Sequence, residues 1–158
     1  MRRSARTRRG TARTAAILTA VATVLAGGLA TAESASANTS PGGCRTTGWA
    51  SEPGGVQLWP CSSGDGSVGI NATVHIRNPN AIDIFPCAQL LQVNSNGTTT
   101  QVGDFGCIGA WTNGAPDLRK GPIGVHQGTY VVVSGFWATI DGHYGYYGGA
   151  QSATIKVF

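Results

Sequence analysis

The chain has 158 residues, of which 41% are hydrophobic and only 11% are charged, and its formal net charge is +4. Six of the eleven basic residues are arginines within the first 13 positions, so residues 38–158 hold five basic and six acidic residues, a formal charge of −1. About 120 residues are enough for one domain with a single core. The near-neutral balance of this part argues against nucleic-acid binding.

Residues 1–37 have the layout of an export signal peptide. The basic head is followed by an apolar run over residues 15–32 and by the small residues Ala35, Ser36 and Ala37. We expect cleavage after Ala37, with Ala32 as the alternative site, and export by the Sec route in preference to the twin-arginine route. Retention of the apolar run as an anchor is the alternative to cleavage. Residues 38–158 are therefore predicted to be one secreted, extracellular domain that has no membrane contact after cleavage.

Apolar residues alternate with polar ones along most of this domain, and no window shows a sustained helical period. The clearest strand is 68–77, in which Val68, Ile70, Ala72, Val74 and Ile76 share one face. Further strands are predicted at 56–59, 82–93, 98–102, 129–140 and 150–158. Short strands separated by Gly, Pro, Asn and Asp predict an all-β fold. We expect an immunoglobulin-like antiparallel β-sandwich of about seven strands, with a barrel as the alternative.

The domain contains all four cysteines of the chain, Cys44, Cys61, Cys87 and Cys107. An even number of cysteines in an exported chain predicts two disulfides, and their wide spacing does not resemble the close pairs of a zinc site. The midpoint between Cys87 and Cys107 falls at the turn signal Asn96-Gly97, so these two cysteines are predicted to face each other across a hairpin. The midpoint between Cys44 and Cys61 falls in the turn-like segment 52–55. Sequential pairing is therefore favoured among three possible connectivities.

Aromatic residues gather in the segment 136–149, around the predicted turn Asp141-Gly142. Alternation places Tyr144 and Tyr146 on one face of this segment and Tyr147 on the other. Aromatic rings among glycines are suited to binding sugars or a protein partner. We therefore take Trp137, Tyr144 and Tyr146 as candidate ligand-binding residues. The alternative is that Trp137 belongs to the core and the tyrosines cover a loop.

Trp111 is the fourth candidate contact, because it lies in a predicted loop between Gly109 and Gly114.

Catalytic and metal chemistry find little support in the sequence. No G-x-S-x-G motif is present, and no pair of carboxylates is placed by the pattern for glycoside hydrolysis. Asp141 and His143 could offer two metal ligands, but nothing in the sequence supplies a third. We therefore predict a protein that is not an enzyme and that has no catalytic residues, no metal site and no cofactor.

The arginine-rich leader, the apolar Ala/Gly run and the compact two-disulfide β domain resemble the small secreted proteins of actinobacteria. Chromoprotein apoproteins, which carry enediyne antibiotics in an immunoglobulin-like sandwich, are similar in length and disulfide count, but their bridges close shorter loops. Secreted subtilisin and amylase inhibitors are also similar in size. This chain contains neither a recognisable reactive-site loop nor the inhibitory Trp-Arg-Tyr triplet. The resemblance implies the layout of the protein and supplies no site residues.

Three functions remain open from the sequence. The favoured one is a non-catalytic binding module that recognises an extracellular polysaccharide or protein surface through exposed aromatic residues. The second is an inhibitor of a secreted hydrolase, in which an exposed loop over residues 113–122 presents Arg119 and Lys120 to the enzyme. The third is a carrier of a small apolar ligand, held in a pocket between the sheets.

Overall fold

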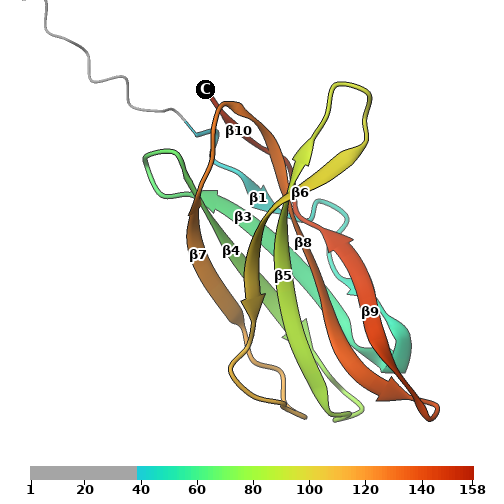
Figure 1. The fold of residues 1–158 in the computed structure, drawn as a ribbon. Coiled ribbons are helices and arrows are strands. Elements are labelled where there is room, and N and C mark those ends of the chain that lie inside the picture. The colour runs from blue at the N-terminus through green and yellow to red at the C-terminus, as the bar shows by residue number, and fades with distance from the viewer. Residues whose placement is uncertain (1–38) are drawn as a thin grey trace, which may run out of the picture. The chain divides into compact units, whose positions relative to one another are not determined.

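A computed structural model describes residues 39–158, which form a sandwich of two antiparallel β-sheets (Figure 1). The predicted signal peptide at residues 1–37 lies outside the described residues. Ten strands and one 3-10 turn make up the described part: β1 (Gly43–Cys44), β2 (Ala50–Ser51), η1 (Pro53–Gly55), β3 (Gln57–Gly64), β4 (Gly69–Arg77), β5 (Ile84–Val93), β6 (Thr99–Cys107), β7 (Leu118–Gly124), β8 (Gly128–Ile140), β9 (His143–Gln151) and β10 (Ile155–Val157).

The two sheets have an immunoglobulin-like strand order. The first sheet runs β1-β3-β4-β7, with β2 also paired to β3, and the second runs β10-β8-β5-β6, with β9 also paired to β8. The chain crosses between the sheets after β4, after β6 and after β7, so that strands distant in sequence become neighbours. The predicted all-β sandwich with two disulfides is therefore confirmed.

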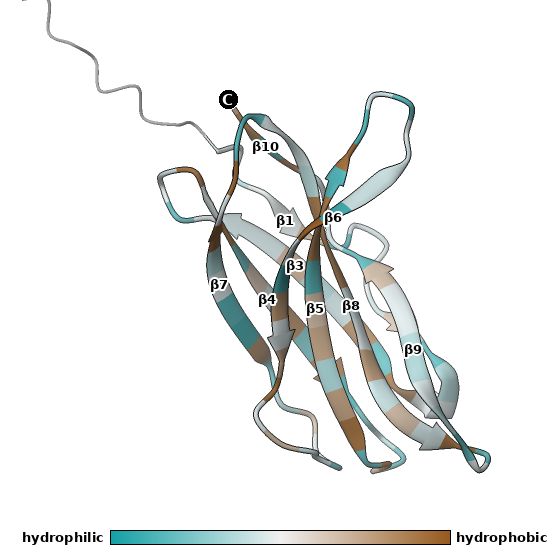
Figure 2. Ribbon diagram, viewed as in Figure 1, coloured by the Kyte–Doolittle hydropathy of each residue, from teal (hydrophilic) through white to brown (hydrophobic). Residues whose placement is uncertain are grey.

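The core lies between the two sheets and is formed by alternate residues of the central strands. Leu58 of β3, Val74 of β4, Leu90 of β5 and Phe136 of β8 are all buried in it. Figure 2 shows the corresponding hydrophobic bands along β4, β5 and β8, whereas β9 is pale along most of its length. Burial of side chains of this size contributes roughly 1.5–3 kcal/mol each, which offsets the conformational entropy lost by the strands.

Both disulfides join directly opposed residues of neighbouring strands. Cys44 of β1 faces Cys61 of β3, and Cys87 of β5 faces Cys107 of β6. The sequential connectivity predicted from the two midpoints is confirmed. The β5–β6 loop spans residues 94–98, longer than a three-residue turn, and two bulges in β6 restore the alignment of the two cysteines.

Four strands were not expected from the sequence: the two-residue strands β1 and β2, and the longer strands β7 and β9. Residues 118–124 form β7, an edge strand paired with β4, so the expectation of an exposed loop over 113–122 is wrong for its second half. Residues 143–151 form β9, which pairs with β8 after a tight turn at Asp141 and Gly142, both with positive φ. Gly145, Gly148 and Gly149 give this segment a low strand propensity, and pairing with β8 outweighs it.

The two ends of the described chain lie together at one end of the sandwich. Thr39 forms a bridge with Val157, and the N–H of Ser40 donates to the carbonyl of Lys156 at 2.8 Å. The backbone N–H of Lys156 in turn donates to Oγ of Ser40 at 2.9 Å. The segment that precedes β1 is thus fastened to the last strand.

Among residues 39–158, no helix is long and apolar enough to cross a membrane.

Removal of the hairpin bridge is expected to lower the stability of the domain markedly. The double variant Cys87→Ala, Cys107→Ala frees a loop with a sequence separation of 20, so the free energy of unfolding should fall by about 3 kcal/mol. Urea unfolding followed by tryptophan fluorescence measures the difference. The variant Cys44→Ala, Cys61→Ala, with a separation of 17, should lose a similar amount. An unchanged unfolding midpoint in the Cys87 and Cys107 variant would contradict a stabilising clasp.

Candidate functional site

Aromatic side chains line up across the outer face of the second sheet. Phe85 of β5 is directly opposite Trp137 of β8, and Trp137 is directly opposite Tyr146 of β9. Because side chains alternate along a strand, the buried Phe136 points into the core and Trp137 points to the other side. Each of the three strands therefore contributes one ring to a row on the outer face of the sheet, and these rings are not part of the core.

A loop brings a fourth ring to the same face. Ile84 at the start of β5 forms a bridge with Thr112, through hydrogen bonds of 2.9 and 3.0 Å. This bridge fixes the loop after β6 beside β5 and places Trp111 against Phe85, with ring centroids 5.5 Å apart and planes stacked at 23°. The loop is further held by the amide of Asn78, which donates to the carbonyls of Ile82 and Asn113.

The rings contact one another and form one cluster, which we call the aromatic platform (Phe85, Trp111, Trp137, Tyr144 and Tyr146). Trp137 stacks on Tyr144 at 5.5 Å and meets Tyr146 edge-on at 5.4 Å, while Trp111 lies 6.3 Å from Tyr144. Trp111, Trp137, Tyr144 and Tyr146 are each at least 36% exposed. The four candidate residues from the sequence thus lie together on one open surface, and Phe85 is a fifth member that sequence reasoning missed.

Gly135 makes room for Tyr146 on the outer face of β8. A Cβ at this position would lie 2.6 Å from the Tyr146 ring and 2.5 Å from the backbone oxygen of Tyr147. Since the Tyr147 oxygen belongs to the backbone, such a contact could not be relieved by a side-chain rotation. The glycine therefore fixes the place where the Tyr146 ring can lie across the sheet.

A pocket of about 490 Å³ opens at the edge of the platform. We call it the platform pocket; its lining residues are Cys87, Gln89, Asp104, Cys107, Trp137 and Tyr146. The disulfide and the two rings give it apolar walls, and an amide and a carboxylate supply the polar groups. Pockets of this composition, apolar with a few placed polar groups, are typical of ligand sites.

A β-bulge aims the carboxylate of Asp104 at this pocket. The register of β6 against β5 shifts between Asp104 and Gly106, which leaves Phe105 unpaired and buried in the core. Gly106 adopts a φ of 75°, and its N–H donates to Oδ1 of Asp104 at 2.7 Å. Bulges of this kind turn a neighbouring side chain to a new direction. The carboxylate is thereby held at the pocket by the backbone of its own strand.

The pKa of the Tyr146 phenol depends on burial and on the charges near the pocket. Burial raises the pKa of its phenol above the ordinary value of 10.0, and the carboxylates of Asp104 and Glu52 raise this pKa further. A negative environment opposes the ionisation of a tyrosine, because the tyrosinate would carry a like charge. The pocket beside the platform is anionic because Asp104 is the one charged residue among those that line it.

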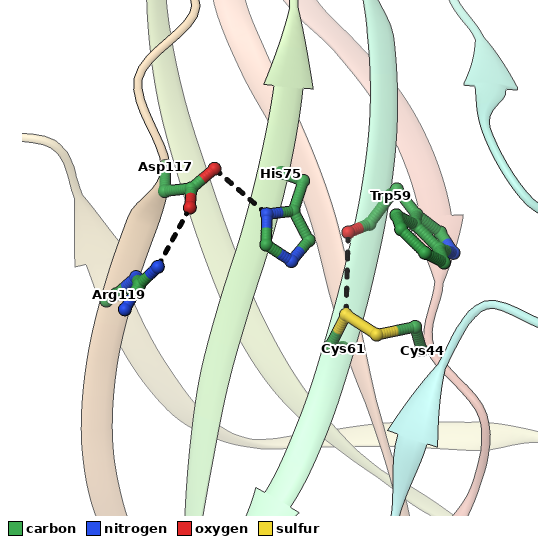
Figure 3. A network of polar contacts seen from close by, with 6 residues as sticks. All are labelled: Cys44, Trp59, Cys61, His75, Asp117 and Arg119. Atoms are coloured by element: carbon green, nitrogen blue, oxygen red, sulfur yellow. Dashed lines mark hydrogen bonds and ion pairs between the residues drawn. A yellow bond between two sulfur atoms is a disulfide. The ribbon is translucent and has the colours of Figure 1, made fainter.

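A second cluster occupies the outer face of the opposite sheet (Figure 3). The Trp59 ring packs between Trp49 and His75, at centroid distances of 5.7 and 5.6 Å. Nδ1 of His75 lies 3.0 Å from Oδ1 of Asp117, and Arg119 donates to the other oxygen of that carboxylate at 3.1 Å. The polar groups of this cluster pair with one another, and its residues link β3, β4 and β7.

Asp117 is the centre of that second cluster. Burial alone would raise the pKa of its carboxyl, but hydrogen bonds from Arg119 and His75, together with their charges, outweigh burial and hold this pKa below its ordinary value of 3.8. Arg119 is thus engaged in an ion pair on a strand, not displayed on a loop. The arrangement differs from the loop that the inhibitor hypothesis requires.

The histidine and aspartate of the β8–β9 turn do not combine with further ligands. Nδ1 of His143 lies 3.0 Å from the backbone carbonyl of Asp141. Within residues 39–158, no three His, Cys, Asp or Glu side chains are grouped in a way that could hold a metal ion.

Comparisons of the chain with protein-family models, with curated proteins and with solved structures gave no match. The function of the domain therefore has to be inferred from the arrangement of its own residues.

Neutralisation of Asp104 is expected to lower the pKa of Tyr146. In Asp104→Asn one of the two like charges beside the phenol is gone, so its pKa should fall but stay above 10.0, because burial still opposes ionisation. An alkaline titration followed by NMR of ring-labelled tyrosine measures the shift. Asp141→Asn, which removes a carboxylate that does not act on Tyr146, is the matched control and should leave the titration unchanged. An unaltered Tyr146 titration in Asp104→Asn would refute the placement of this carboxylate.

Replacement of Asp117 is expected to weaken the acid dependence of stability. The folded-state pKa of Asp117 lies below 3.8, so its stabilising effect is present above that pH and is lost as the pH falls through the folded-state value. Asp117→Asn should therefore unfold more easily than the parent at pH 7, and the difference should close as the solution is acidified. Thermal unfolding over a pH series tests this. Asp83→Asn, a change at a carboxylate outside any ion pair of residues 39–158, is the matched control, and an equal pH-dependent loss in this variant would contradict the role of Asp117.

Proposed function

We propose that the protein is a non-catalytic binding module that recognises an extracellular polysaccharide through the aromatic platform. The observation that carries this proposal is a contiguous set of five rings on the outer face of a sheet whose core is complete without them. Exposed apolar clusters are unusual on a soluble domain and mark sites of interaction. Sugar rings present apolar C–H faces that fit flat aromatic surfaces.

The rings are held in place before any ligand arrives. Trp137, Tyr144 and Tyr146 stand on paired strands, and Trp111 is fixed by the Ile84–Thr112 bridge. Rigid side chains lose little conformational entropy on binding, so more of the contact energy is available for affinity. Loop-borne rings without such support would bind more weakly.

The platform also lacks the features of a closed structural cluster. On the opposite sheet, Trp59 donates its indole N–H to the carbonyl of Arg45, and Arg77 lies over the Trp49 ring at 4.1 Å. Tyr147, which faces the core, donates its hydroxyl to the carbonyl of His143. The hydroxyls of Tyr144 and Tyr146 make no such bond to residues 39–158, which leaves them open to the hydroxyls of a sugar.

Binding to insoluble polysaccharides should depend on the exposed rings of the platform. The double variant Trp111→Ala, Tyr144→Ala removes two exposed rings without opening the core, and each ring covered by a ligand contributes on the order of 1–2 kcal/mol. We therefore expect affinity to fall by more than about tenfold. Depletion of the oxidised protein from solution by cellulose, chitin and bacterial cell wall measures this.

Phe158→Ala is the matched control for that experiment. Phe158 is 60% exposed, close to the 64% of Tyr144, but it lies at the end of the chain outside the platform. This variant should bind like the parent. Failure of the parent to bind any of the polymers, or equal binding by the double variant, would refute the proposed function.

A further inference from the structure

The polar side of the platform pocket is negative, and this feature deepens the proposed function by indicating the class of polysaccharide. Among the residues that line the pocket, Asp104 is the only charged one, and no lysine or arginine is present. The two ion pairs of residues 39–158 both involve Asp117, which directly precedes β7 of the other sheet. The charge of Asp104 is therefore not neutralised by the protein.

The position of the Asp104 carboxylate is fixed, and one of its oxygens is free. Oδ1 accepts the Gly106 N–H, whereas Oδ2 forms no hydrogen bond with residues 39–158. The two rings of the pocket, Trp137 and Tyr146, lie beside this carboxylate. Ring faces and a carboxylate both attract a cation, and the attraction increases when the site is partly shielded from water.

Residues 39–158 contain five basic residues, none of which lines the platform pocket. Arg45 lines a different pocket, with Glu52 and with Gly148 and Gly149 of β9. The other four lie farther away. Arg77, Arg119 and Lys120 belong to β4 and β7 of the opposite sheet. Lys156 pairs with Thr129, eight residues along β8 from Trp137, a distance of roughly 26 Å on an extended strand. The raised pKa of Tyr146, caused by burial and then by Asp104 and Glu52, agrees with a negative field at this place.

We propose that the platform recognises a polymer of amino sugars with free ammonium groups, such as N-deacetylated β-linked glucosamine, in which one ammonium pairs with Asp104 while sugar faces cover the rings. This inference rests on the proposed polysaccharide binding. A neutral or N-acetylated glycan would cover the same rings but leave the Asp104 carboxylate unpaired in the covered pocket, which carries a desolvation cost. An acidic glycan would be repelled.

The test compares two soluble ligands that differ only at the nitrogen, the glucosamine hexamer and the N-acetylglucosamine hexamer, by calorimetry at pH 5.5. The parent should prefer the glucosamine hexamer by about fivefold, as expected for one exposed ion pair with a cation–π contribution. This preference should decrease at high salt. In Asp104→Asn the preference should shrink to within about twofold, while the affinity for the acetylated hexamer stays within about twofold of the parent.

Two controls separate failure of this inference from failure of the proposed function. Asp141→Asn removes a carboxylate outside the pocket and should keep the preference. The double variant Trp111→Ala, Tyr144→Ala should lose affinity for both hexamers to the same extent.

Two results would overturn the inference and leave polysaccharide binding intact. One is equal binding of both hexamers by the parent, and the other is an undiminished preference in Asp104→Asn. Absence of binding to either hexamer and to the insoluble polymers overturns both.

Discussion

The pairing of β8 with its neighbours is the constraint on which both the core and the platform depend. This strand pairs with β5 along one edge and with β9 and β10 along the other. Its side chains alternate, so the same register buries Phe136 and exposes Trp137. A slip by one residue would exchange these two rings and place the wrong face of β8 against the opposite sheet. Stability and the candidate binding surface are therefore two results of one hydrogen-bond register.

The outer faces of the two sheets use aromatic residues in different ways. On the β3–β4–β7 sheet, Trp59 and Trp49 are combined with a histidine, an ion pair and an arginine, and the polar groups satisfy one another. On the β5–β8–β9 sheet, the rings contact other rings, and the nearby carboxylate of Asp104 keeps a free oxygen. A surface whose groups are mutually satisfied gains little from a partner, whereas one with open rings and an unpaired charge gains much.

The sequence was sufficient for those features that depend on local pattern. Alternation alone separated Tyr144 and Tyr146 from Tyr147, and the midpoints of the cysteine spacings indicated both bridges. It was not sufficient for contacts between distant segments. Phe85 became part of the platform because β5 lies beside β8, and Trp111 joined it through a bridge to Ile84. Asp104 gained its role from a bulge, and strand β9 formed despite its glycines because an edge of β8 was available.

The fastening of residues 39 and 40 to β10 also bears on the order in which the domain can form. A chain is synthesised from its N-terminus, and here the first described residues bond to Lys156 and Val157 of β10, the last of the described strands. The β3–β4 and β5–β6 hairpins can form early from local contacts, but this closing contact has to wait until β10 has emerged. Assembly of the complete sandwich is thereby postponed until β10 has been synthesised, so removal of residues 156 and 157 would leave the segment before β1 without its partner.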